Sequence, residues 1–369
     1  MPSADPSPAR HILTYARTLD GGGVERAQLR LARQWLALGR RVTLVVGNAR
    51  GPLAADLPPG LAVIDLDMPD YAALLRRLPA IVATERPDIV FCAGNYYTGI
   101  ALWLRLRSSL RRHAMVPPIV AKMSNAPDRG DHGRVAGAVH AGWLALHGSF
   151  LDHLVAMTPA TATAATRATR MTGRVTVIPN PPAVPKADAP LPPLPAGRFI
   201  LGVGRLAPQK RWDRLIAAFA DLSTPDVALV ILGDGDDRAA IVDQARRLGL
   251  ADRVHLPGHA ADPMPVMARA ALLALTSDYE GVPGVLREAL AMGTPVVTTD
   301  SSDSIPEIVT ETALGSIVAR DDHAGLVAAL QQWLVSGAIR PAPVAQPGTD
   351  SAARYLALFD RLVADRQSR

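Results

Sequence analysis

The sequence predicts an α/β protein with two doubly wound domains, each made of parallel strands that alternate with helices. The chain has 369 residues, which is long for one hydrophobic core and typical of two domains. Short apolar strands alternate with amphipathic helical segments in both halves, as in parallel sheets covered by helices. A proline-rich segment over residues 183–197 interrupts this alternation, and we expect it to link the two domains.

Residues 1–182 are expected to form the N-terminal domain. Its first strand leads into a loop that ends in Gly21, Gly22 and Gly23, at the start of a helix. Backbone N–H groups at such a helix N-terminus are free to meet an anion. The expected elements are strands at 11–16, 41–46, 62–66, 89–93, 119–123, 154–157 and 175–178, and a helix at 24–38.

Residues 198–340 are expected to form the C-terminal domain, and residues 341–369 a second proline-rich hinge followed by an amphipathic helix. Open parallel sheets bind ligands beyond the carboxyl ends of their strands, so functional residues are expected on the loops that follow strands. The expected elements are strands at 199–203, 228–232, 254–256, 272–275 and 296–299, and helices at 212–220, 237–248, 285–292 and 351–364.

The composition, with 49% hydrophobic and 20% charged residues, is that of an ordinary globular protein. The N-terminus lacks the apolar core of a signal peptide, and we expect no transmembrane helix. The most apolar run, 135–151, is expected to be a buried alanine-rich helix. The lone Cys92 is expected to be a buried core thiol, which excludes an intramolecular disulfide and fits a cytoplasmic location.

Basic residues are concentrated in the first half of the chain. Residues 1–184 contain 21 Arg and Lys against 12 Asp and Glu, and the remainder contains 18 against 22. A basic half is attracted to a polyanion or an anionic membrane surface, or it is simply a solvated face. The basic, partly apolar helix expected at 101–113 fits either contact with the inner-membrane surface or ordinary packing. No nucleic-acid recognition motif is present, so nucleic acid is not an expected partner.

Two glutamates, Glu280 and Glu288, are separated by seven residues that include an elbow of glycine and proline. The elbow predicts that Glu280 lies on a loop above the sheet and that Glu288 lies about one turn into the following helix. Both carboxylates can then face one small, hydroxyl-rich ligand at the helix N-terminus. This geometry suits a nucleotide sugar.

The first loop of the second domain carries Arg205 and Lys210. A guanidinium group forks onto phosphate oxygens and an ammonium group adds a point charge, so this pair can stabilise a departing nucleoside diphosphate. Gly202, Gly204 and Ala207 also match a loose dinucleotide-binding pattern. The acidic residue expected to hold the ribose is missing, which disfavours a dehydrogenase.

The next loop contains Asp234 and Asp236, at a spacing that can hold Mg²⁺ or Mn²⁺ against a diphosphate. This triplet opens a helix, where aspartate is a preferred N-cap, and capping is therefore the favoured interpretation. No metal or other cofactor is expected.

An ordered set of motifs resembles the retaining glycosyltransferases of GT-B fold, the glycosyltransferase family 4 or group 1 type. The resemblance spans about residues 11–335 and rests on the whole set, since each motif alone is weak. It implies two Rossmann-like domains that face a central cleft, with the C-terminal helix crossing back onto the N-terminal domain. The motifs are GGGVE at 21–25, VIPNP at 177–181, GRLAPQK at 204–210, GDGDDR at 233–238, LPGH at 256–259 and EGVPGVLREALAMGTPVV at 280–297.

The resemblance also implies roles for individual residues. Arg205 and Lys210 would hold the donor diphosphate, Glu288 would bond the ribose hydroxyls, and Glu280 would touch hydroxyls of the donor sugar. Glu280, Arg205 and Lys210 are the expected catalytic residues. The other expected donor-binding residues are Gly22, Gly23, Gly233, Gly281, Val282, Pro283, Gly284 and Val285.

One region departs from the family pattern. Many members carry a histidine at the end of an N-terminal-domain strand that faces the cleft, whereas this chain reads VAKMSNAP at 120–127. We expect Lys122, Ser124 or Asn125 to take over a polar contact to the sugar. His132, on the next loop, is a further acceptor-side candidate.

The expected function is transfer of a sugar, with retention of anomeric configuration, from a nucleoside diphosphate sugar to a glycan or lipid-linked saccharide. The expected context is the synthesis of a cell-surface polysaccharide or lipopolysaccharide. A front-face substitution, in which the departing phosphate takes the acceptor proton, needs electrostatics and positioning more than an acid–base pair. The alternatives are a nucleotide-sugar epimerase, an NAD-dependent dehydrogenase, and a polyanion-binding protein that is not an enzyme.

Overall fold

The computed structural model describes residues 8–110, 116–127, 133–186, 189–335 and 339–368. These residues form two compact units. Unit 1 contains the described residues up to 181 together with those from 347 onward, and unit 2 contains those from 182 to 346.

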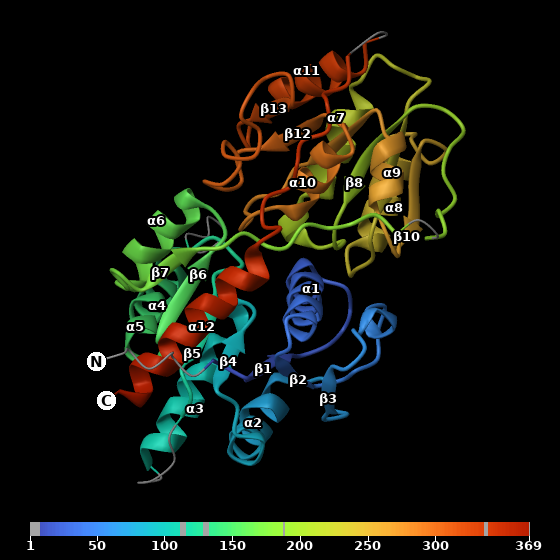
Figure 1. Ribbon diagram of the computed structural model, residues 1–369. Helices are drawn as coiled ribbons and strands as arrows, with labels where there is room; N and C mark the ends of the chain where they lie inside the picture. The colour runs from blue at the N-terminus through green and yellow to red at the C-terminus, as the bar shows by residue number, and fades with distance from the viewer. Residues whose placement is uncertain (1–7, 111–115, 128–132, 187–188, 336–338, 369) are drawn as a thin grey trace. The chain divides into compact units, whose positions relative to one another are not determined.

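Unit 1 is built, over its described residues, on a seven-stranded parallel sheet (Figure 1). The strand order β3-β2-β1-β4-β5-β6-β7 shows that the chain winds from β1 to one edge and then from β4 to the other. Helices cover both faces of such a sheet, which explains why β1, β4, β5 and β6 are buried along their whole length. The strands are β1 (His11–Ala16), β2 (Arg41–Val46), β3 (Ala62–Asp65), β4 (Ile89–Cys92), β5 (Ile119–Lys122), β6 (His153–Ala156) and β7 (Val175–Val177).

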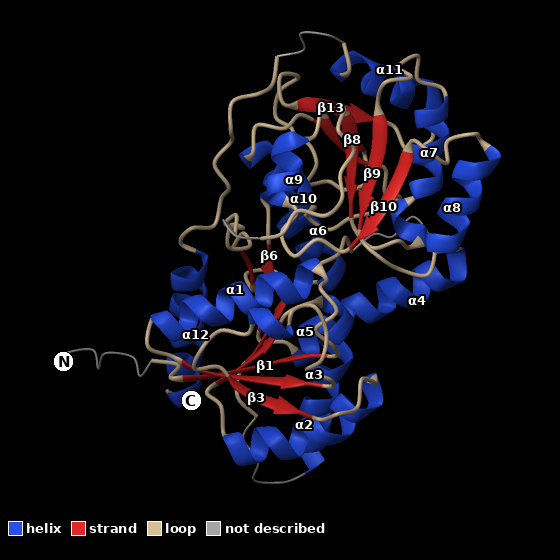
Figure 2. Ribbon diagram, turned by 90° about the vertical axis from the view of Figure 1, so that its right-hand side faces the viewer, coloured by secondary structure: helices blue, strands red, loops and turns tan. Residues whose placement is uncertain are grey.

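Helices flank this sheet on both sides (Figure 2). The start of α6 illustrates how the sequence sets their bounds: the Thr158 hydroxyl accepts a hydrogen bond from the Thr161 N–H, and Pro159 occupies the first helical position. The helices of unit 1 are α1 (Gly23–Ala37), η1 (Ala54–Asp56), α2 (Tyr71–Glu85), η2 (Asn95–Tyr97), α3 (Thr98–Leu110), α4 (Arg134–Ala145), α5 (His147–Phe150), α6 (Pro159–Thr169) and α12 (Ser351–Gln367).

The C-terminal helix α12 belongs to unit 1, where it packs on α1 and the sheet (Figure 1). Trp35 of α1 and Phe91 of β4 contact Tyr355 edge to face, with ring centroids 5.8 and 5.3 Å apart. Phe359 joins the same aromatic cluster. Aromatic rings bury large apolar areas and gain further from edge-to-face geometry. The predicted packing of the last helix on the N-terminal domain is confirmed.

The prediction of one buried helix over 135–151 is wrong. The chain forms two helices there, α4 and α5, and most of α4 is exposed within the described structure. Val135 and Val139 are 80% and 69% exposed, whereas Leu144 is buried. Alanine-rich sequence favours a helix without specifying which face is buried, so hydropathy alone gave a wrong prediction of burial. No helix among the described residues is long and apolar enough to cross a membrane.

Unit 2 repeats the same architecture on a six-stranded parallel sheet, counted over its described residues, in the order β10-β9-β8-β11-β12-β13. Trp212, Leu215, Ile216 and Phe219 recur at helical spacing on α7 and are buried against this sheet. The strands are β8 (Phe199–Val203), β9 (Ala228–Leu232), β10 (Val254–Gly258), β11 (Leu272–Leu275), β12 (Val296–Thr299) and β13 (Gly315–Val318), and the helices are η3 (Pro208–Lys210), α7 (Trp212–Ala220), α8 (Arg238–Arg247), α9 (Met264–Arg269), α10 (Gly284–Ala291) and α11 (His323–Trp333).

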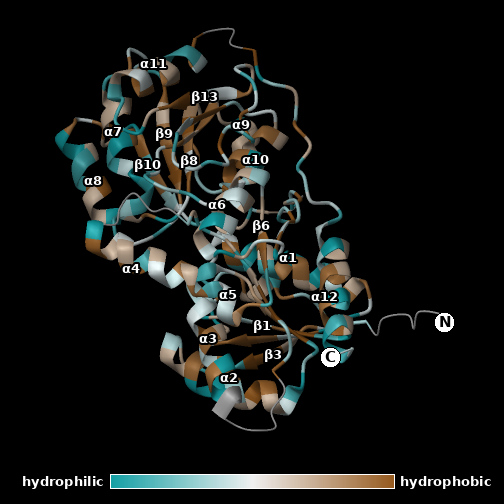
Figure 3. Cartoon of the chain, turned by 90° about the vertical axis from the view of Figure 1, so that its left-hand side faces the viewer, coloured by the Kyte–Doolittle hydropathy of each residue, from teal (hydrophilic) through white to brown (hydrophobic). Residues whose placement is uncertain are grey.

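Hydropathy follows this division into layers. In Figure 3 the strands of both sheets are mostly brown, the colour of hydrophobic residues, whereas the surface helix α8 is largely teal. The strand order of each sheet reverses at one point, between β1 and β4 in unit 1 and between β8 and β11 in unit 2. Doubly wound sheets bind their ligands at the carboxyl side of this reversal. The loops after these four strands are therefore the place to look for a site.

Candidate active site

In unit 2 the loops after β8 and β9 contact each other backbone to backbone. The Leu206 N–H donates to the Asp234 carbonyl at 2.9 Å. A Cβ atom on Gly233 would lie 1.9 Å from the Gly204 carbonyl oxygen, and the φ angle of Gly233 is +145°. Only glycine permits this approach without displacing one of the loops. Gly233 thus supports the loop that carries Arg205.

The central contact of this region joins the loops after β8 and β11. Lys210 Nζ lies 2.6 Å from Glu280 Oε1, and Ser277 Oγ donates to the same oxygen at 2.7 Å. The two charged side chains are only 14% and 11% exposed. Their attraction is therefore less screened than that of a surface ion pair, and the serine fixes the orientation of the carboxylate.

A second group of contacts fixes the backbone of the same two loops. Asp278 accepts hydrogen bonds from Arg211 at 3.1 Å and from Arg214 at 2.9 Å. Gln209 Nε2 donates to the Tyr279 carbonyl at 2.7 Å. These contacts lie on either side of the Lys210–Glu280 pair along the chain. The pair is therefore held by a rigid frame.

The elbow that follows Glu280 is held by the loop after β12. The Glu280 N–H donates to the Ser301 carbonyl at 2.8 Å. The hydroxyl groups of Ser302 and Ser304 both donate to the Gly281 carbonyl, the latter at 2.9 Å. These contacts leave the elbow little freedom.

Glu288 lies one turn into α10, as its spacing from Glu280 predicted. It is partly buried, and its Oε1 would lie 3.9 Å from a Cβ on Gly284, so the carboxylate is near the start of the helix. Pro283 at the N-cap supplies no side-chain hydrogen bond to the first turn. The first N–H groups of a helix have no partner within it, and they favour an anion.

Arg205 differs from Lys210 in its surroundings. Its side chain is exposed, and within the described residues its guanidinium group makes no hydrogen bond or ion pair. Its backbone carbonyl accepts a hydrogen bond from Trp212 Nε1 at 2.9 Å, which anchors the loop to α7. Arg205 is therefore an exposed cation on a loop that is anchored to α7.

The predicted capping role of Asp234 and Asp236 is wrong. The residue at the N-cap of α8 is Asp237, and its side chain makes no capping hydrogen bond. Asp234 instead accepts from the Gly235 N–H at 2.9 Å. The helix begins at Arg238, so the triplet lies outside it. Across the described chain, no group of three or more His, Cys, Asp and Glu side chains is placed to hold a metal ion.

In unit 1 the predicted glycine turn forms the start of α1. Gly22 is the N-cap and Gly23 is the first helical residue. A Cβ on Gly22 would lie 2.2 Å from Glu25 Oε2, so the carboxylate of this glutamate folds back over the turn. The sequence-based assignment did not single out Glu25, although its place in the GGGVE motif was a signal.

Polar groups gather where β4 and β5 end. Ser124 Oγ donates to Asn95 Oδ1 at 2.8 Å, and the Asn125 N–H donates to the same oxygen at 3.1 Å. A Cβ on Gly94 would lie 2.9 Å from Ser124 Oγ, so a glycine is needed beside this cluster. Asn95 was missed by sequence reasoning, and its position just after a predicted strand could have indicated it. His132 lies outside the described residues.

Lys122, the last residue of β5, does not face solvent. It is 1% exposed, and its Nζ donates to Asn180 Oδ1 at 3.1 Å. Burial lowers the pKa of Lys122 to about 8. Burial also raises the pKa of the neighbouring Cys92 thiol to about 11, which agrees with the predicted core thiol. Lys122 therefore cannot reach a substrate directly as it stands.

The predicted basic helix corresponds to α3, whose two described arginines have different surroundings. Arg105 donates to the Phe150 carbonyl and pairs with Asp152, so it is tied to the fold. The Arg107 guanidinium lies 5.6 Å from the centre of the Trp103 ring. Trp103 and Leu106 are 38% and 49% exposed. The other cations of this prediction, Arg111 and Arg112, lie outside the described residues.

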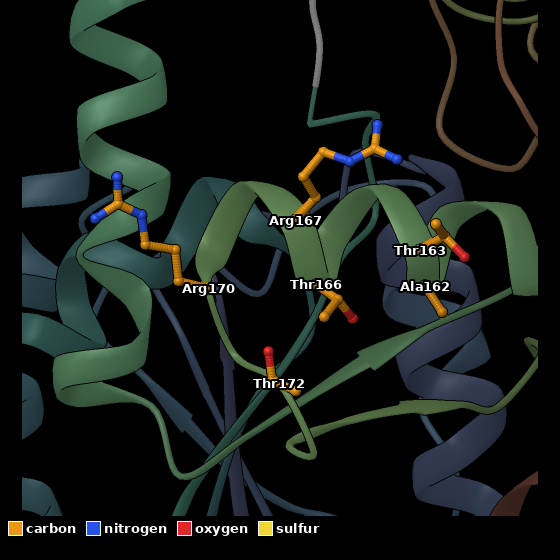
Figure 4. Close-up of a pocket in the computed structure, with 6 residues that line it drawn as sticks. All are labelled: Ala162, Thr163, Thr166, Arg167, Arg170 and Thr172. Carbon is orange, nitrogen blue, oxygen red and sulfur yellow. The ribbon is translucent and has the colours of Figure 1, made fainter.

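A surface hollow along α6 lies apart from these groups (Figure 4). Its volume is about 590 Å³, and it is open to solvent. Figure 4 shows the guanidinium groups of Arg167 and Arg170 pointing away from each other, so they do not converge on one anion. The hollow is lined by Ala162, Thr163, Thr166, Arg167, Arg170 and Thr172.

Two parallel-sheet units of this kind, with charged loops at the strand reversal of the second, define a GT-B type of enzyme. The model of "Glycosyl transferases group 1" matches residues 188–343, and that of "Glycosyltransferase Family 4" matches residues 21–181. The chain belongs to this glycosyltransferase family. The predicted family and fold class are confirmed, and the epimerase and dehydrogenase alternatives are not favoured.

Two curated relatives match part of the chain. One is N-acetylgalactosamine-N,N'-diacetylbacillosaminyl-diphospho-undecaprenol 4-alpha-N-acetylgalactosaminyltransferase of Campylobacter jejuni, 34% identical over 39% of this chain and 40% of the relative. The other is the lipopolysaccharide core biosynthesis glycosyltransferase LpsE of Rhizobium meliloti, 31% identical over 46% of each chain. The chain thus matches less than half the length of these relatives.

A solved structure extends the likeness to the whole fold. HepE of Anabaena, in complex with UDP and glucose, matches 97% of this chain and 99% of its own with a TM-score of 0.70 and 21% identity. At this identity the likeness concerns the fold.

Proposed function

We propose that this protein transfers a sugar from a nucleoside diphosphate sugar to a glycan or lipid-linked saccharide, with retention of anomeric configuration. The proposed context is the synthesis of a cell-surface polysaccharide or lipopolysaccharide. The observation that carries the proposal is the sheltered Lys210–Glu280 ion pair at the strand reversal of unit 2, with Arg205 exposed on the same loop. The UDP complex of HepE and the names of the two relatives support it.

The charges of unit 2 suit a diphosphate. Glu280 balances the charge of Lys210 before a ligand binds, so Arg205 supplies the additional positive charge on this loop. A diphosphate oxygen that approaches Lys210 shares it with Glu280, and Arg205 forks onto a second oxygen. The backbone N–H groups at the start of α10, beside Pro283 and Gly284, add a favourable dipole.

The two glutamates then hold different parts of the donor. Glu280, oriented by Ser277, accepts hydrogen bonds from hydroxyls of the sugar. Glu288, one turn into α10, accepts hydrogen bonds from the ribose hydroxyls. Val282 and Val285 pack beside the donor, Gly281 and Gly233 leave room for it, and Gly22 and Gly23 approach its phosphates.

The transfer step is a substitution at the anomeric carbon on the face from which the diphosphate departs. The bond between this carbon and the diphosphate oxygen breaks, and the acceptor oxygen forms a new bond to the same carbon. The acceptor proton passes to the departing diphosphate oxygen. Lys210 and Arg205 stabilise the charge that grows on the leaving group. No metal ion takes part in the proposed step.

Unit 1 is proposed to position the acceptor. Asn95, Ser124 and Asn125 present donors and acceptors at the carboxyl ends of β4 and β5. Trp103 and Leu106, with Arg107 beside them, are proposed to contact the anionic cytoplasmic face of the inner membrane. Co-sedimentation with vesicles that contain phosphatidylglycerol tests this contact, and equal binding by the W103S/L106S variant contradicts it.

The function is tested by a thermal-shift panel of nucleoside diphosphates and their sugars. A donor at 100 times its dissociation constant is expected to stabilise the folded protein by about 2.7 kcal/mol. Incubation of the best donor with saccharide acceptors, followed by NMR, reports the anomeric configuration of the product. We expect retention, and we expect full activity in excess EDTA.

Two outcomes contradict the proposal in different ways. Absence of a shift with every nucleoside diphosphate overturns the donor class. An inverted product, or activity that is lost in EDTA and restored by Mn²⁺, overturns the mechanism while leaving the enzyme class in place.

A further inference from the structure

Lys122 is the buried charge that the proposed transfer step does not use. Of the 39 Lys and Arg residues, only Lys122, Lys186 and Lys210 are lysines. Lys210 belongs to the proposed donor site, and Lys186 is exposed near the start of unit 2. Lys122 is 1% exposed, although burying an ammonium group is costly. A buried charge of this kind calls for an explanation.

The side chain of Lys122 lies on the sheet face that α1 covers. Val120, two residues earlier and thus on the same face of β5, packs in the cluster that contains Trp35 of α1. Two charges on α1 act on Lys122 through space: Glu25 raises its pKa and Arg30 lowers it. Asn180 accepts its hydrogen bond, whereas Cys92 of β4 pairs with Ala121 and lies on the opposite face of the sheet.

Glu25 connects Lys122 to the glycine turn. Its carboxylate folds back over Gly22, where an added Cβ would lie 2.2 Å from Oε2. A positive charge beneath α1 attracts this carboxylate and holds it in that position. Loss of the Lys122 charge would therefore remove an attraction that acts on the carboxylate beside the Gly22–Gly23 turn.

Asn180 connects Lys122 to the chain that leaves and re-enters unit 1. A Cβ on Gly348 would lie 2.4 Å from the Asn180 carbonyl oxygen, and Ser351 Oγ donates to the Pro179 carbonyl at 2.7 Å. Arg30 of α1 also donates to the Pro181 carbonyl at 3.3 Å. The outgoing and returning segments of unit 1 thus meet beside the amide that Lys122 holds.

We propose that Lys122 is a positioning residue, which holds the Gly22–Gly23 turn through Glu25 and the outgoing chain segment through Asn180, so that its positive charge is needed for diphosphate binding. This inference rests on the proposed function, because it takes the glycine turn to approach the donor phosphates. Loss of the charge releases the turn without removing any group that touches the substrate. Deprotonation near pH 8 has the same effect as mutation.

The test measures UDP affinity by calorimetry from pH 6.5 to 9.5. The affinity of the wild type is expected to fall as the pH rises through about 8. Lys122→Met is expected to bind UDP about tenfold more weakly at pH 7, with no inflection near pH 8. Lys122→Arg keeps the charge and is expected to restore binding and to abolish the inflection. Lys186→Met is the matched control and keeps the wild-type profile.

Folding is monitored separately by thermal unfolding. A merely structural lysine would lower the melting temperature of Lys122→Met, whereas a positioning lysine gives weak binding with an unchanged or raised melting temperature. Wild-type affinity and a wild-type pH profile in Lys122→Met overturn the proposal. The Lys210→Ala variant separates the proposed donor site from the proposed role of Lys122. If Lys210→Ala also binds UDP with wild-type affinity, the proposed donor site is wrong. If Lys210→Ala binds weakly and Lys122→Met binds normally, only the role of Lys122 is wrong.

A second measurement does not depend on the stability of Lys122 variants. The chain has three lysines, so ¹³C-lysine labelling gives three side-chain Cε signals, each of which can be followed by NMR against pH. The signal of Lys122 is expected to titrate near pH 8, and Glu25→Gln is expected to lower this pKa further because Glu25 raises it. An identical midpoint in Glu25→Gln overturns the link between Lys122 and the turn.

Discussion

In unit 2 the lysine beside the strand reversal, Lys210, lies on the loop after β8 and pairs with a carboxylate at 2.6 Å. In unit 1 the buried lysine, Lys122, lies at the end of β5, beside β4 and not on the loop after β1, and it contacts the neutral amide of Asn180 at 3.1 Å. The two sheets share the same strand order around the reversal, which lies between β8 and β11 in unit 2 and between β1 and β4 in unit 1. The two lysines therefore occupy different places in the same architecture: one pairs with a carboxylate on a loop, and the other is buried beside a neutral amide.

The loops of the two units also differ in how their glycines are used. A Cβ on Gly233 would meet the Gly204 carbonyl, which is backbone, whereas a Cβ on Gly22 would meet the Glu25 side chain. Backbone cannot yield without moving a whole loop, and a side chain can rotate away. The unit 2 loops are therefore rigid, and the unit 1 turn is adjustable. This difference agrees with a fixed donor site and a turn that is held by charge.

The largest expected effect is on catalysis by Lys210→Ala. We expect kcat to fall about 100- to 1000-fold, because a preorganised charge at the leaving group is removed. The folded protein is expected to remain intact, since the Asp278 frame persists. The fall in kcat is measured by steady-state kinetics with the donor that the thermal-shift panel selects, and Lys186→Ala is the control. A fall of less than threefold would show that Lys210 is not at the reacting diphosphate.

Gly233→Ala is expected to lower the free energy of unfolding by about 2–4 kcal/mol, through steric overlap and a φ angle that alanine avoids. Gly22→Ala is expected to cost less than about 1 kcal/mol, because Glu25 can move. Urea unfolding measures both, and Gly249→Ala, which has a positive φ angle but open space around it, is the control for backbone strain alone. Equal losses at 233 and 22 would remove the contrast between the units.

Asn95→Ala is expected to weaken binding of the saccharide acceptor without weakening binding of the donor nucleotide. The change leaves the Ser124 hydroxyl and the Asn125 N–H without their acceptor, at a cost of about 1–3 kcal/mol. We expect the KM for the saccharide acceptor to rise while the affinity for UDP stays within about twofold. A parallel loss of UDP affinity would place this cluster at the donor instead.

The smallest expected effect is on stability in Lys122→Met, which at pH 7 is expected to stay within about 1 kcal/mol of the wild type or above it. The folded wild type holds the Lys122 proton less tightly than the unfolded chain, with a pKa of about 8 against 10.5. Its free energy of unfolding therefore gains a contribution as the pH rises between these values. Measured by urea unfolding, the free energy of unfolding of the wild type should therefore rise relative to that of the variant over this window. A constant difference would contradict the lowered pKa.

Much of the fold followed from strand and helix periodicity. The predicted strands at 11–16, 41–46, 199–203, 228–232, 272–275 and 296–299 match the structure residue for residue. Each is a compact, mostly apolar run that is followed by a glycine or a polar residue. The run at 135–151 failed because its alanines and glycines fit a helix on any face, and exposure depends on tertiary neighbours that one sequence does not encode.

The candidate site was predicted in part. The glycine–proline elbow predicted that Glu280 lies on a loop and that Glu288 lies in the following helix, because glycine and proline restrict the local backbone conformation. The direct Lys210–Glu280 contact joins residues 70 positions apart, and no local pattern indicates such a pairing. The burial of Lys122 was missed for a similar reason: its place at the end of an apolar strand is equally compatible with solvent and with the space beneath α1.

The central claim is that the loop after β8 and the start of α10 bind the donor nucleotide. Its most direct test is the affinity for UDP, measured by calorimetry at pH 7 for the wild type, Lys210→Ala and Glu288→Ala. We predict that both variants bind UDP at least about tenfold more weakly while their melting temperatures stay close to that of the wild type. Wild-type affinity in both variants would contradict the claim.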